Sequence, residues 1–276
     1  MGKHNRGWVE IEEKNVANGL NGKVVDKFIT EIVTSIKEKI GTEYKHAIWV
    51  GGNSYDDPGD VHVQMADNSI IKIELKFSSK KGAGTNKNLG QGTFKKKVNQ
   101  NIMGYQEYDI SLGLREQRYN LIENRIGKKI KTAGDYCNHL RILRDKGDPI
   151  IDQIANITTP GQESYAQYAS KELSNHLDKV NILVHNILGT DILDSSQQDV
   201  LYCVIKNFRN SQQTVEFFDF TDLDKKITKI ESVGKSIKFL NKSEKDVLRF
   251  SVNWKNICQG GATPSFNVFI GNAFKH

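Results

Sequence analysis

The sequence predicts an α/β protein of the α+β type, in which helices flank a β-sheet. Two patterns of apolar residues lead to this prediction. Apolar side chains recur at helical spacing in residues 24–40 and 170–188, whereas they alternate with polar ones, as in half-buried strands, in residues 61–77 and 248–255. At 276 residues the chain is long enough to form a complete hydrophobic core.

The first elements expected along the chain are a polar segment, a helix and a strand. Residues 1–19 are mostly polar and are expected to form a short arm or a surface element. A helix is predicted over residues 24–40 and a strand over residues 45–50. The apolar stripe of the helix consists of Val24, Phe28, Ile32 and Ile36.

A hairpin is predicted next. Val61 to Met65 alternates apolar and polar residues, Asp67-Asn68 is typical of a turn, and Ser69 to Phe77 alternates again. Glu74 and Lys76 then share one face of the second strand, about 7 Å apart. Because Asp60 begins the first strand, the hairpin brings it beside Glu74. Gly59 lets the backbone enter this position sharply.

Two carboxylates and a lysine in this arrangement suit phosphodiester hydrolysis. Asp60 and Glu74 offer the hard oxygen ligands that Mg²⁺ prefers. A bound metal lowers the pKa of a water and polarises a phosphate, and Lys76 is placed to orient or deprotonate that water. The pattern therefore indicates a metal-dependent nuclease. An Asp before a strand and an exposed Glu-x-Lys are also common in ordinary structural strands.

Asp60 followed by Glu74-Leu75-Lys76 resembles the D…(D/E)xK signature of the PD-(D/E)xK nuclease superfamily, in particular its type II restriction endonucleases. The resemblance covers residues 20–100, and it departs from the fuller motif because Gly59 separates Pro58 from Asp60. It implies a restriction-endonuclease-like core, with a central mixed β-sheet flanked by helices. The expectation is a single nuclease domain over residues 1–276, with the catalytic core at 20–100, a helical insertion at 101–190 and C-terminal strands at 191–276.

The same resemblance implies a homodimer that cuts both strands of double-stranded DNA at a short sequence. Cleavage would require Mg²⁺, which Mn²⁺ can replace, and a DNA methyltransferase would be the genetic rather than the bound partner. Asp60, Glu74 and the backbone carbonyl of Leu75 would hold the metal. Many members add an acid from the first helix, and Glu31 lies at the border of the apolar face of helix 24–40.

The segment after the hairpin, residues 78–100, is expected to be a loop that contacts DNA. Glycines let a backbone approach phosphates, lysines neutralise them, and Asn and Gln read adenine edges; a solvated loop is the simpler explanation. The DNA-contact candidates in this segment are Lys80, Lys81, Asn86, Lys87, Asn88, Gln91, Thr93 and Lys95.

The remaining chain is expected to be helical and then to return to strands. Long helices are predicted at 107–126 and 170–188, with a loop at Pro160-Gly161 between them, and a hairpin at 199–220. In the strand at 248–255 a polar face suits a DNA groove, although a half-exposed sheet would look the same. The DNA-contact candidates here are Arg249, Asn253 and Lys255 in the strand, and Gln259 in the loop that follows.

Composition supports a polyanion partner without requiring one. The formal net charge is +6. The three cysteines are widely spaced, which argues against a zinc site and favours a reducing compartment. No apolar run is long enough to span a membrane, so a cytoplasmic protein is expected. Three alternatives stay open: a structure-selective or repair nuclease, a non-catalytic DNA-binding protein, and a sugar- or protein-binding module.

Overall fold

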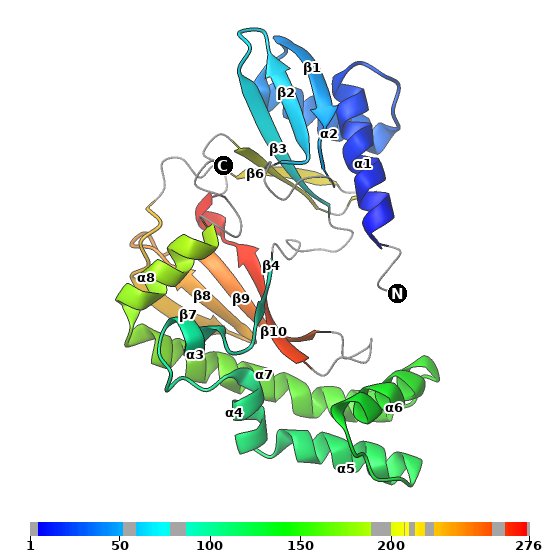
Figure 1. Ribbon diagram of the computed structural model, residues 1–276, viewed down its shortest axis with the longest axis vertical. Coiled ribbons are helices and arrows are strands. Elements are labelled where there is room, and N and C mark those ends of the chain that lie inside the picture. The colour runs from blue at the N-terminus through cyan, green and yellow to red at the C-terminus, as the bar shows by residue number, and fades with distance from the viewer. Residues whose placement is uncertain are drawn as a thin grey trace. The chain divides into compact units, whose positions relative to one another are not determined.

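The computed structural model describes residues 5–51, 59–77, 87–188, 200–206, 208–209, 213–218, 224–255 and 263–274. The chain forms two compact units, each with its own sheet (Figure 1). Unit 1 comprises residues 1–86, 186–223 and 274–276, and unit 2 comprises residues 87–185 and 224–273. Each unit is thus assembled from segments that are far apart in the sequence.

Unit 1 contains a mixed five-stranded sheet in the order β1-β2-β3-β5-β6. β3 pairs with β5 in parallel, and the other neighbours are antiparallel. In Figure 1 this sheet combines blue and cyan strands with yellow ones from much later in the chain. The strands are Tyr44–Trp49 (β1), Val61–Met65 (β2), Ile70–Phe77 (β3), Val200–Lys206 (β5) and Thr214–Phe218 (β6).

Two helices complete the core of unit 1, α1 (Asn5–Leu20) and α2 (Lys27–Ile40). Asp26 caps α2 by accepting a hydrogen bond from the backbone N–H of Ile29 at 3.0 Å. The sequence predicts a short arm or a surface element at residues 1–19; the arm is wrong, because α1 is a helix that buries a narrow apolar stripe against the sheet. That stripe consists of Val16, Ala17 and Leu20, and it packs with Ile29, Ile32 and Ile36 of α2.

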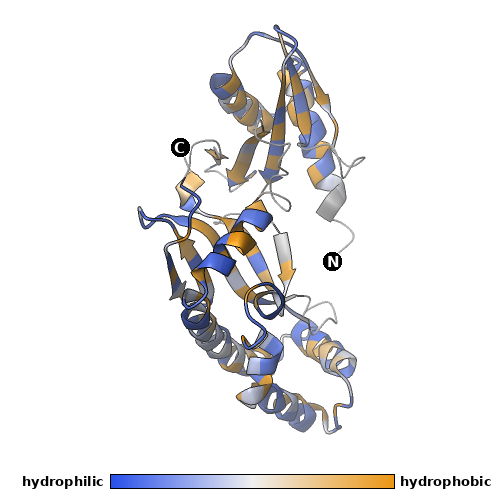
Figure 2. Cartoon of the chain, turned by 60° about the vertical axis from the view of Figure 1, so that its left-hand side comes forward, coloured by the Kyte–Doolittle hydropathy of each residue, from blue (hydrophilic) through white to orange (hydrophobic). Residues whose placement is uncertain are grey.

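Unit 2 contains an antiparallel five-stranded sheet in the order β4-β10-β9-β8-β7. Its strands are Lys87–Gly90 (β4), Lys229–Val233 (β7), Ser236–Leu240 (β8), Asp246–Lys255 (β9) and Thr263–Ile270 (β10), and a 3₁₀ turn, η2, follows at Asn272–Phe274. Aromatic rings fill the core beside it: Phe94 stacks on Phe250 and Tyr165 on Phe266. Figure 2 shows apolar residues as orange bands along the strands of both sheets.

The helices of unit 2 differ from the two long helices predicted there. They are Thr93–Lys97 (α3), Tyr105–Ser111 (α4), Leu114–Ile126 (α5), Ala133–Asp145 (α6), Ile150–Ser174 (α7) and Leu177–Asn186 (α8). The first predicted helix is broken at Gly113, whose positive φ of 66° ends α4 and begins α5. The second is divided between the end of α7 and α8, with a break at residues 175–176, and α7 itself begins 20 residues earlier than predicted, at Ile150.

The predicted loop at Pro160-Gly161 is also wrong, because both residues lie inside α7. A proline inside a helix removes one backbone donor and costs about 3 kcal/mol. Burial of Tyr165, Ala169 and Leu173 on the same helix outweighs that cost. At Gly161 a Cβ atom would lie 2.5 Å from Leu114 Cδ1, so the glycine lets α5 pack closely against α7.

The loop predicted over residues 78–100 holds two elements, β4 and α3. β4 pairs with β10, and Leu89 lies opposite Phe266 in the register. Its partner strand is remote in the sequence, so no local pattern reveals it. The α+β class is confirmed, while the restriction-endonuclease-like core and the single nuclease domain stay predictions. No helix within the described ranges is long and apolar enough to cross a membrane.

Gly271 offers a test of unit 2 packing. Its Cβ would lie 1.9 Å from the carbonyl oxygen of Asp246, and its N–H donates to Val247 O at 2.9 Å. Gly271→Ala should therefore lower the free energy of unfolding by about 2 to 3 kcal/mol, measured by urea denaturation. Gly90→Ala is the control, because its Cβ would meet no atom within 4 Å. Equal unfolding of both variants would contradict this packing.

Candidate active site

The hairpin of β2 and β3 brings Asp60 to the middle of β3. The backbone N–H of Asp60 donates to Ile73 O at 2.7 Å, and its carboxylate Oδ2 accepts from the N–H of Leu75, also at 2.7 Å. Gly59 has a positive φ of 91°, and a Cβ there would lie 3.2 Å from the backbone of Ile73. The glycine that interrupts the expected Pro-Asp pair is therefore required by this close approach. Pro58 lies outside the described residues.

Glu74 and Lys76 lie on one face of β3, as the alternation predicted, and form an ion pair with each other. Both side chains are only partly exposed. The Asp60 carboxyl lies close enough to Glu74 and Lys76 for both charges to shift its pKa. The three residues that the sequence singled out for catalysis are therefore brought together.

Burial and the neighbouring charges shift the pKa values of the residues in this cluster. Burial raises the pKa of Asp60 to about 7, and the negative charge of Glu74 adds to the rise while Lys76 opposes it. Burial by itself would lower the pKa of Lys76, but Glu74, Tyr202 and Asp60 together raise it above its usual value. Lys76 is therefore an ammonium near neutral pH, while Asp60 is close to half-protonated.

The helix acid that the structure brings to Asp60 is Glu13 of α1. Its Oε2 accepts a hydrogen bond from Trp49 Nε1 at 3.0 Å, and the residue is 6% exposed. Burial raises its pKa, against the hydrogen bond from Trp49 and the charge of Lys76. A Cβ placed on Gly51 would lie 2.8 Å from Glu13 Oε2 and 3.3 Å from Asp60 Oδ1, so the two carboxylates flank Gly51.

Sequence reasoning chose Glu31 for this place and missed Glu13. Glu31 is exposed on α2, and its carboxylate accepts a weak hydrogen bond from Gln213 Nε2 at 3.4 Å. A signal for Glu13 was present, because it precedes Val16 and Ala17 by three and four residues and so shares their buried face. A carboxylate on the apolar stripe of a helix needs a partner in the interior.

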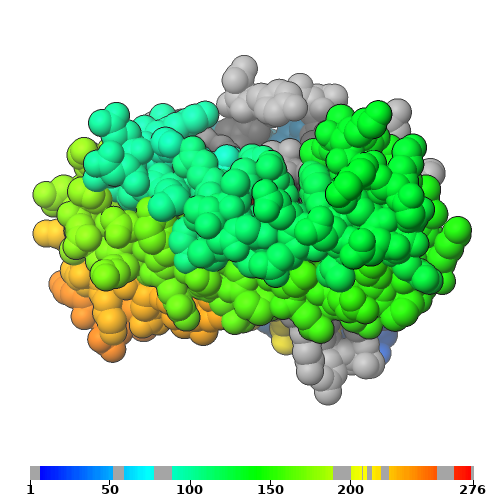
Figure 3. All heavy atoms as spheres, turned by 90° about the horizontal axis from the view of Figure 1, so that it is seen from below, coloured from blue at the N-terminus to red at the C-terminus, as the bar shows by residue number. Residues whose placement is uncertain are grey.

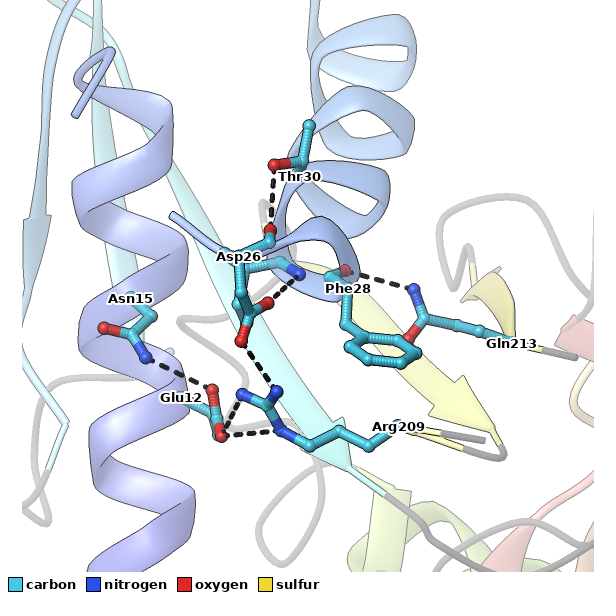
Figure 4. Close-up of polar contacts among 8 residues, drawn as sticks. Glu12, Asn15, Asp26, Phe28, Thr30, Arg209 and Gln213 are labelled. Carbon is cyan, nitrogen blue, oxygen red and sulfur yellow. Dashed lines mark hydrogen bonds and ion pairs between the residues drawn. The ribbon is translucent and has the colours of Figure 1, made fainter. Parts of the chain in front are cut away.

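A salt-bridge network fixes α1 against α2 and the end of β5 (Figure 4). The guanidinium of Arg209 reaches Glu12 of α1 and Asp26 at the start of α2, both at 2.6 Å. Asn15 donates a further hydrogen bond to Glu12 at 3.2 Å. Because Glu12 directly precedes Glu13, this network holds the turn of α1 that presents Glu13 to Trp49.

The side chains of Asp60 and Glu74 offer the oxygen atoms that a divalent metal takes as ligands. Asp60 and Glu74 supply carboxylates whose mutual repulsion a cation would relieve. Since Ile73 O faces β2, the carbonyl of Leu75, two residues on, faces the same side, at the point where β2 begins. Within the described ranges no three His, Cys, Asp or Glu side chains are grouped tightly enough to hold a metal by themselves. Water and a phosphate oxygen would have to complete the shell, as is usual for Mg²⁺.

The DNA-contact candidates between residues 78 and 100 divide into two groups. Three make contacts inside unit 2: Gln91 accepts from the N–H of Gln106 at 3.1 Å, Thr93 donates to Gly90 O at 2.7 Å, and Lys95 pairs with Glu107 at 2.8 Å. These bonds stabilise the turns around α3 and α4. Lys80, Lys81 and Asn86 lie outside the described residues, as do the side chains of Lys87 and Asn88.

The candidates on β9 lie on a polar face of the sheet of unit 2. Arg249 and Asn253 are partly exposed, and the guanidinium of Arg249 lies 4.9 Å from the ring centre of Phe269. The register continues this face onto β10, where Asn267 lies opposite Ser251. The polar face is thus present, and its contact with DNA stays a prediction. Gln259 and the side chain of Lys255 lie outside the described residues.

No protein-family model, curated protein or solved structure matches this chain. The chemistry of the site therefore carries the functional argument by itself.

The raised pKa of Asp60 predicts how stability depends on pH. Between about pH 4 and 7 the folded protein keeps a proton that the unfolded chain releases, so Asp60 makes stability fall as pH rises. Asp60→Asn should thus be more stable than the wild type at pH 8, by on the order of 2 to 4 kcal/mol in metal-free buffer. The difference should disappear toward pH 4 in urea unfolding.

The control for this prediction is Asp67→Asn. Asp67 lies in the β2–β3 turn, and hydrogen bonds from the side chain and backbone of Ser69 lower its pKa. That variant should gain no stability at pH 8. A difference between Asp60→Asn and the wild type that is the same at pH 4 and pH 8 would show that Asp60 ionises normally.

The salt-bridge network gives a second prediction. Arg209→Met removes the guanidinium and leaves Glu12, whose side chain is 9% exposed, without its cation. The variant should lose about 2 kcal/mol of stability. Lys229→Met is the control, since Lys229 pairs with Glu231 and Glu244 at the surface and should have little effect. Equal losses in the two variants would rule out a special role for Arg209.

Proposed function

We propose that this chain is a magnesium-dependent endonuclease of double-stranded DNA that recognises a short sequence, as type II restriction endonucleases do. One observation carries the proposal. Asp60, Glu74 and Lys76 converge where β2 begins, with the backbone of Leu75 facing the same point and Glu13 beside it. Burying several carboxylates around one lysine costs free energy, and such costly clusters of ionisable groups are typical of catalytic sites. Phosphodiester hydrolysis is a reaction that uses these residue types.

In the proposed reaction each residue has a distinct task. Mg²⁺, when bound, would supply the positive charge that polarises the phosphate and lowers the pKa of a water. The N–H of Leu75 holds the Asp60 carboxylate in place, while Glu74 both offers an oxygen and orients Lys76. The Lys76 ammonium donates hydrogen bonds to water or phosphate and offsets the charge that develops in the transition state. Because its pKa is raised, Lys76 is protonated near neutral pH, so its main role is to position water or phosphate as a cation and not to accept a proton as a base.

The distribution of charge supports DNA as the substrate. Unit 2 contains 24 lysines and arginines against 15 aspartates and glutamates, a net charge of +9, whereas unit 1 contains 15 against 18, a net charge of −3. The positive excess therefore lies in the unit without the acidic cluster. Unit 2 also presents the polar sheet face with Arg249 and Asn253. We propose that the basic residues of unit 2 contribute to binding the DNA phosphates, and that a homodimer cuts both strands.

Cleavage of unmethylated plasmid and phage DNA tests the proposal. Wild-type protein should produce discrete fragments with Mg²⁺ and none with EDTA. Lys76→Met and Asp60→Asn should each reduce the rate at least about 100-fold. Glu13→Gln should reduce it less, because Glu13 acts from beside the two metal-binding carboxylates. Lys45→Met is the control, since Lys45 on β1 is exposed and donates to Asn68 of the β2–β3 turn at 2.6 Å.

Other outcomes have definite meanings. Smearing or nicking that requires Mg²⁺ and Lys76 would point to a structure-selective or non-specific nuclease on the same site. Cleavage by Lys76→Met at the wild-type rate would refute the assignment of the site. DNA binding without cleavage on any substrate would favour a non-catalytic DNA-binding protein.

A further inference from the structure

A pocket in unit 2 lies apart from the residues used so far. It has a volume of about 220 Å³ and is formed by α6, α7, the turn after β7 and the end of β9. A cavity of roughly 150 Å³ is enough to hold benzene, so this pocket can take one or two fused rings. Figure 3 views the molecule from the side of the unit 2 helices, which appear in green.

The inner wall of the pocket is apolar. Leu140 of α6 and Ile154 of α7 are buried, and Ile151 and Ala155 complete this wall. Such a surface accepts the faces of a planar ring but offers nothing to a charged group. The occupant must therefore have an apolar or aromatic part.

One polar side chain in the wall of this pocket has no partner among the described residues. Gln162 is 5% exposed and lines the pocket, yet its amide makes no hydrogen bond within the part of the chain that the structure describes. The amide is not one of the fully enclosed polar atoms of the described residues, so it opens onto the pocket and can bond to a group bound there. Its neighbour Thr158 is satisfied, since its hydroxyl donates to Ile154 O at 2.7 Å. A primary amide offers a donor and an acceptor side by side, which matches the hydrogen-bonding edge of a nucleobase.

Positive charge surrounds the opening. Arg141, Arg144 and Lys235 line the pocket, and none of the described lining residues is acidic. Arg144 also pairs with Asp145 at 2.7 Å, and both side chains are exposed. Guanidinium groups bind phosphate oxygens in pairs. The opening is therefore suited to a phosphate.

We propose that this pocket binds a nucleotide, with its base against Ile151 and Ile154, its base edge on Gln162 and its phosphate on Arg141 and Arg144. The nucleotide can be free in solution, or it can belong to bound DNA and be turned out of the duplex. The second source requires unstacking a base, which costs least where the base is already unpaired. The proposal does not depend on Asp60, Glu74 or Lys76.

Binding measurements on the full-length chain in EDTA test this without any cleavage. In one arm the four deoxynucleoside 5′-monophosphates are titrated by calorimetry, with inorganic phosphate and the unphosphorylated nucleosides alongside. In the other arm duplexes of equal length are compared, fully paired or with a single unpaired nucleotide at the centre. At least one monophosphate, or the duplex with the unpaired nucleotide over the paired one, should be preferred.

Two variants and a control make the test specific. Gln162→Leu keeps the size of the side chain, and it should weaken the preferred binding about tenfold through lost hydrogen bonds. Arg141→Ala with Arg144→Ala should weaken the monophosphate but not the nucleoside. Lys171→Ala on the same helix, exposed and outside the pocket, should bind normally. Circular dichroism shows whether Gln162→Leu folds, and the arginine variants at the opening test the pocket independently.

The possible results distinguish a free nucleotide from a nucleotide of bound DNA, and both from a pocket that binds no nucleotide. Variant-sensitive binding of a monophosphate alone assigns a site for free nucleotides, and a variant-sensitive preference for the unpaired nucleotide assigns a pocket for an extruded base. If neither probe is preferred, or if the variants bind as the wild type does, the pocket is not a nucleotide site. A failed cleavage assay with variant-sensitive binding here would refute the nuclease assignment and leave the pocket standing.

Discussion

The parallel pairing of β3 with β5 is the constraint on which the architecture depends. Leu75 lies opposite Cys203 and Glu74 opposite Tyr202, although more than a hundred residues separate the two strands. Parallel neighbours cannot be joined by a tight turn and need a long crossover. Here the crossover contains all the helices from α3 to α8. With β2 on one side and β5 on the other, β3 is an interior strand, so the face that carries Glu74 and Lys76 is fixed.

That fixed face makes the candidate site electrostatically unfavourable in the free protein. Asp60 and Glu13 both have raised pKa values because burial and like charges penalise their ionised forms. The Arg209 network and the Leu75 N–H hold the acids together all the same. Rigid support of an unfavourable charge arrangement is typical of sites where function is kept at the expense of stability. A bound cation would turn the same arrangement into a favourable one.

Local patterns were enough to predict the strands β2 and β3 and the grouping of Asp60 with Glu74 and Lys76, because a two-residue period and a turn define a hairpin without other information. They failed wherever the partner was distant. The local pattern predicts a loop at β4, because the partner of β4 is the distant strand β10. It predicts a short arm or a surface element at α1, because the buried stripe of that helix is only Val16, Ala17 and Leu20 amid polar residues. The prediction of Glu31 instead of Glu13 fails for a related reason. Periodicity shows which face of a helix is buried, but it does not show which helix lies next to Asp60 and β3.

The division of charge between the units suits the proposed nuclease. A site built from Glu13, Asp60 and Glu74 repels a polyanion, and the net charge of −3 on unit 1 adds to that repulsion. In the proposed nuclease, attraction for phosphates would come from elsewhere in the chain, and the net charge of +9 on unit 2 would supply it. Separating most of the basic residues from the acidic cluster would let the proposed nuclease attract DNA through unit 2 and hold a metal in unit 1.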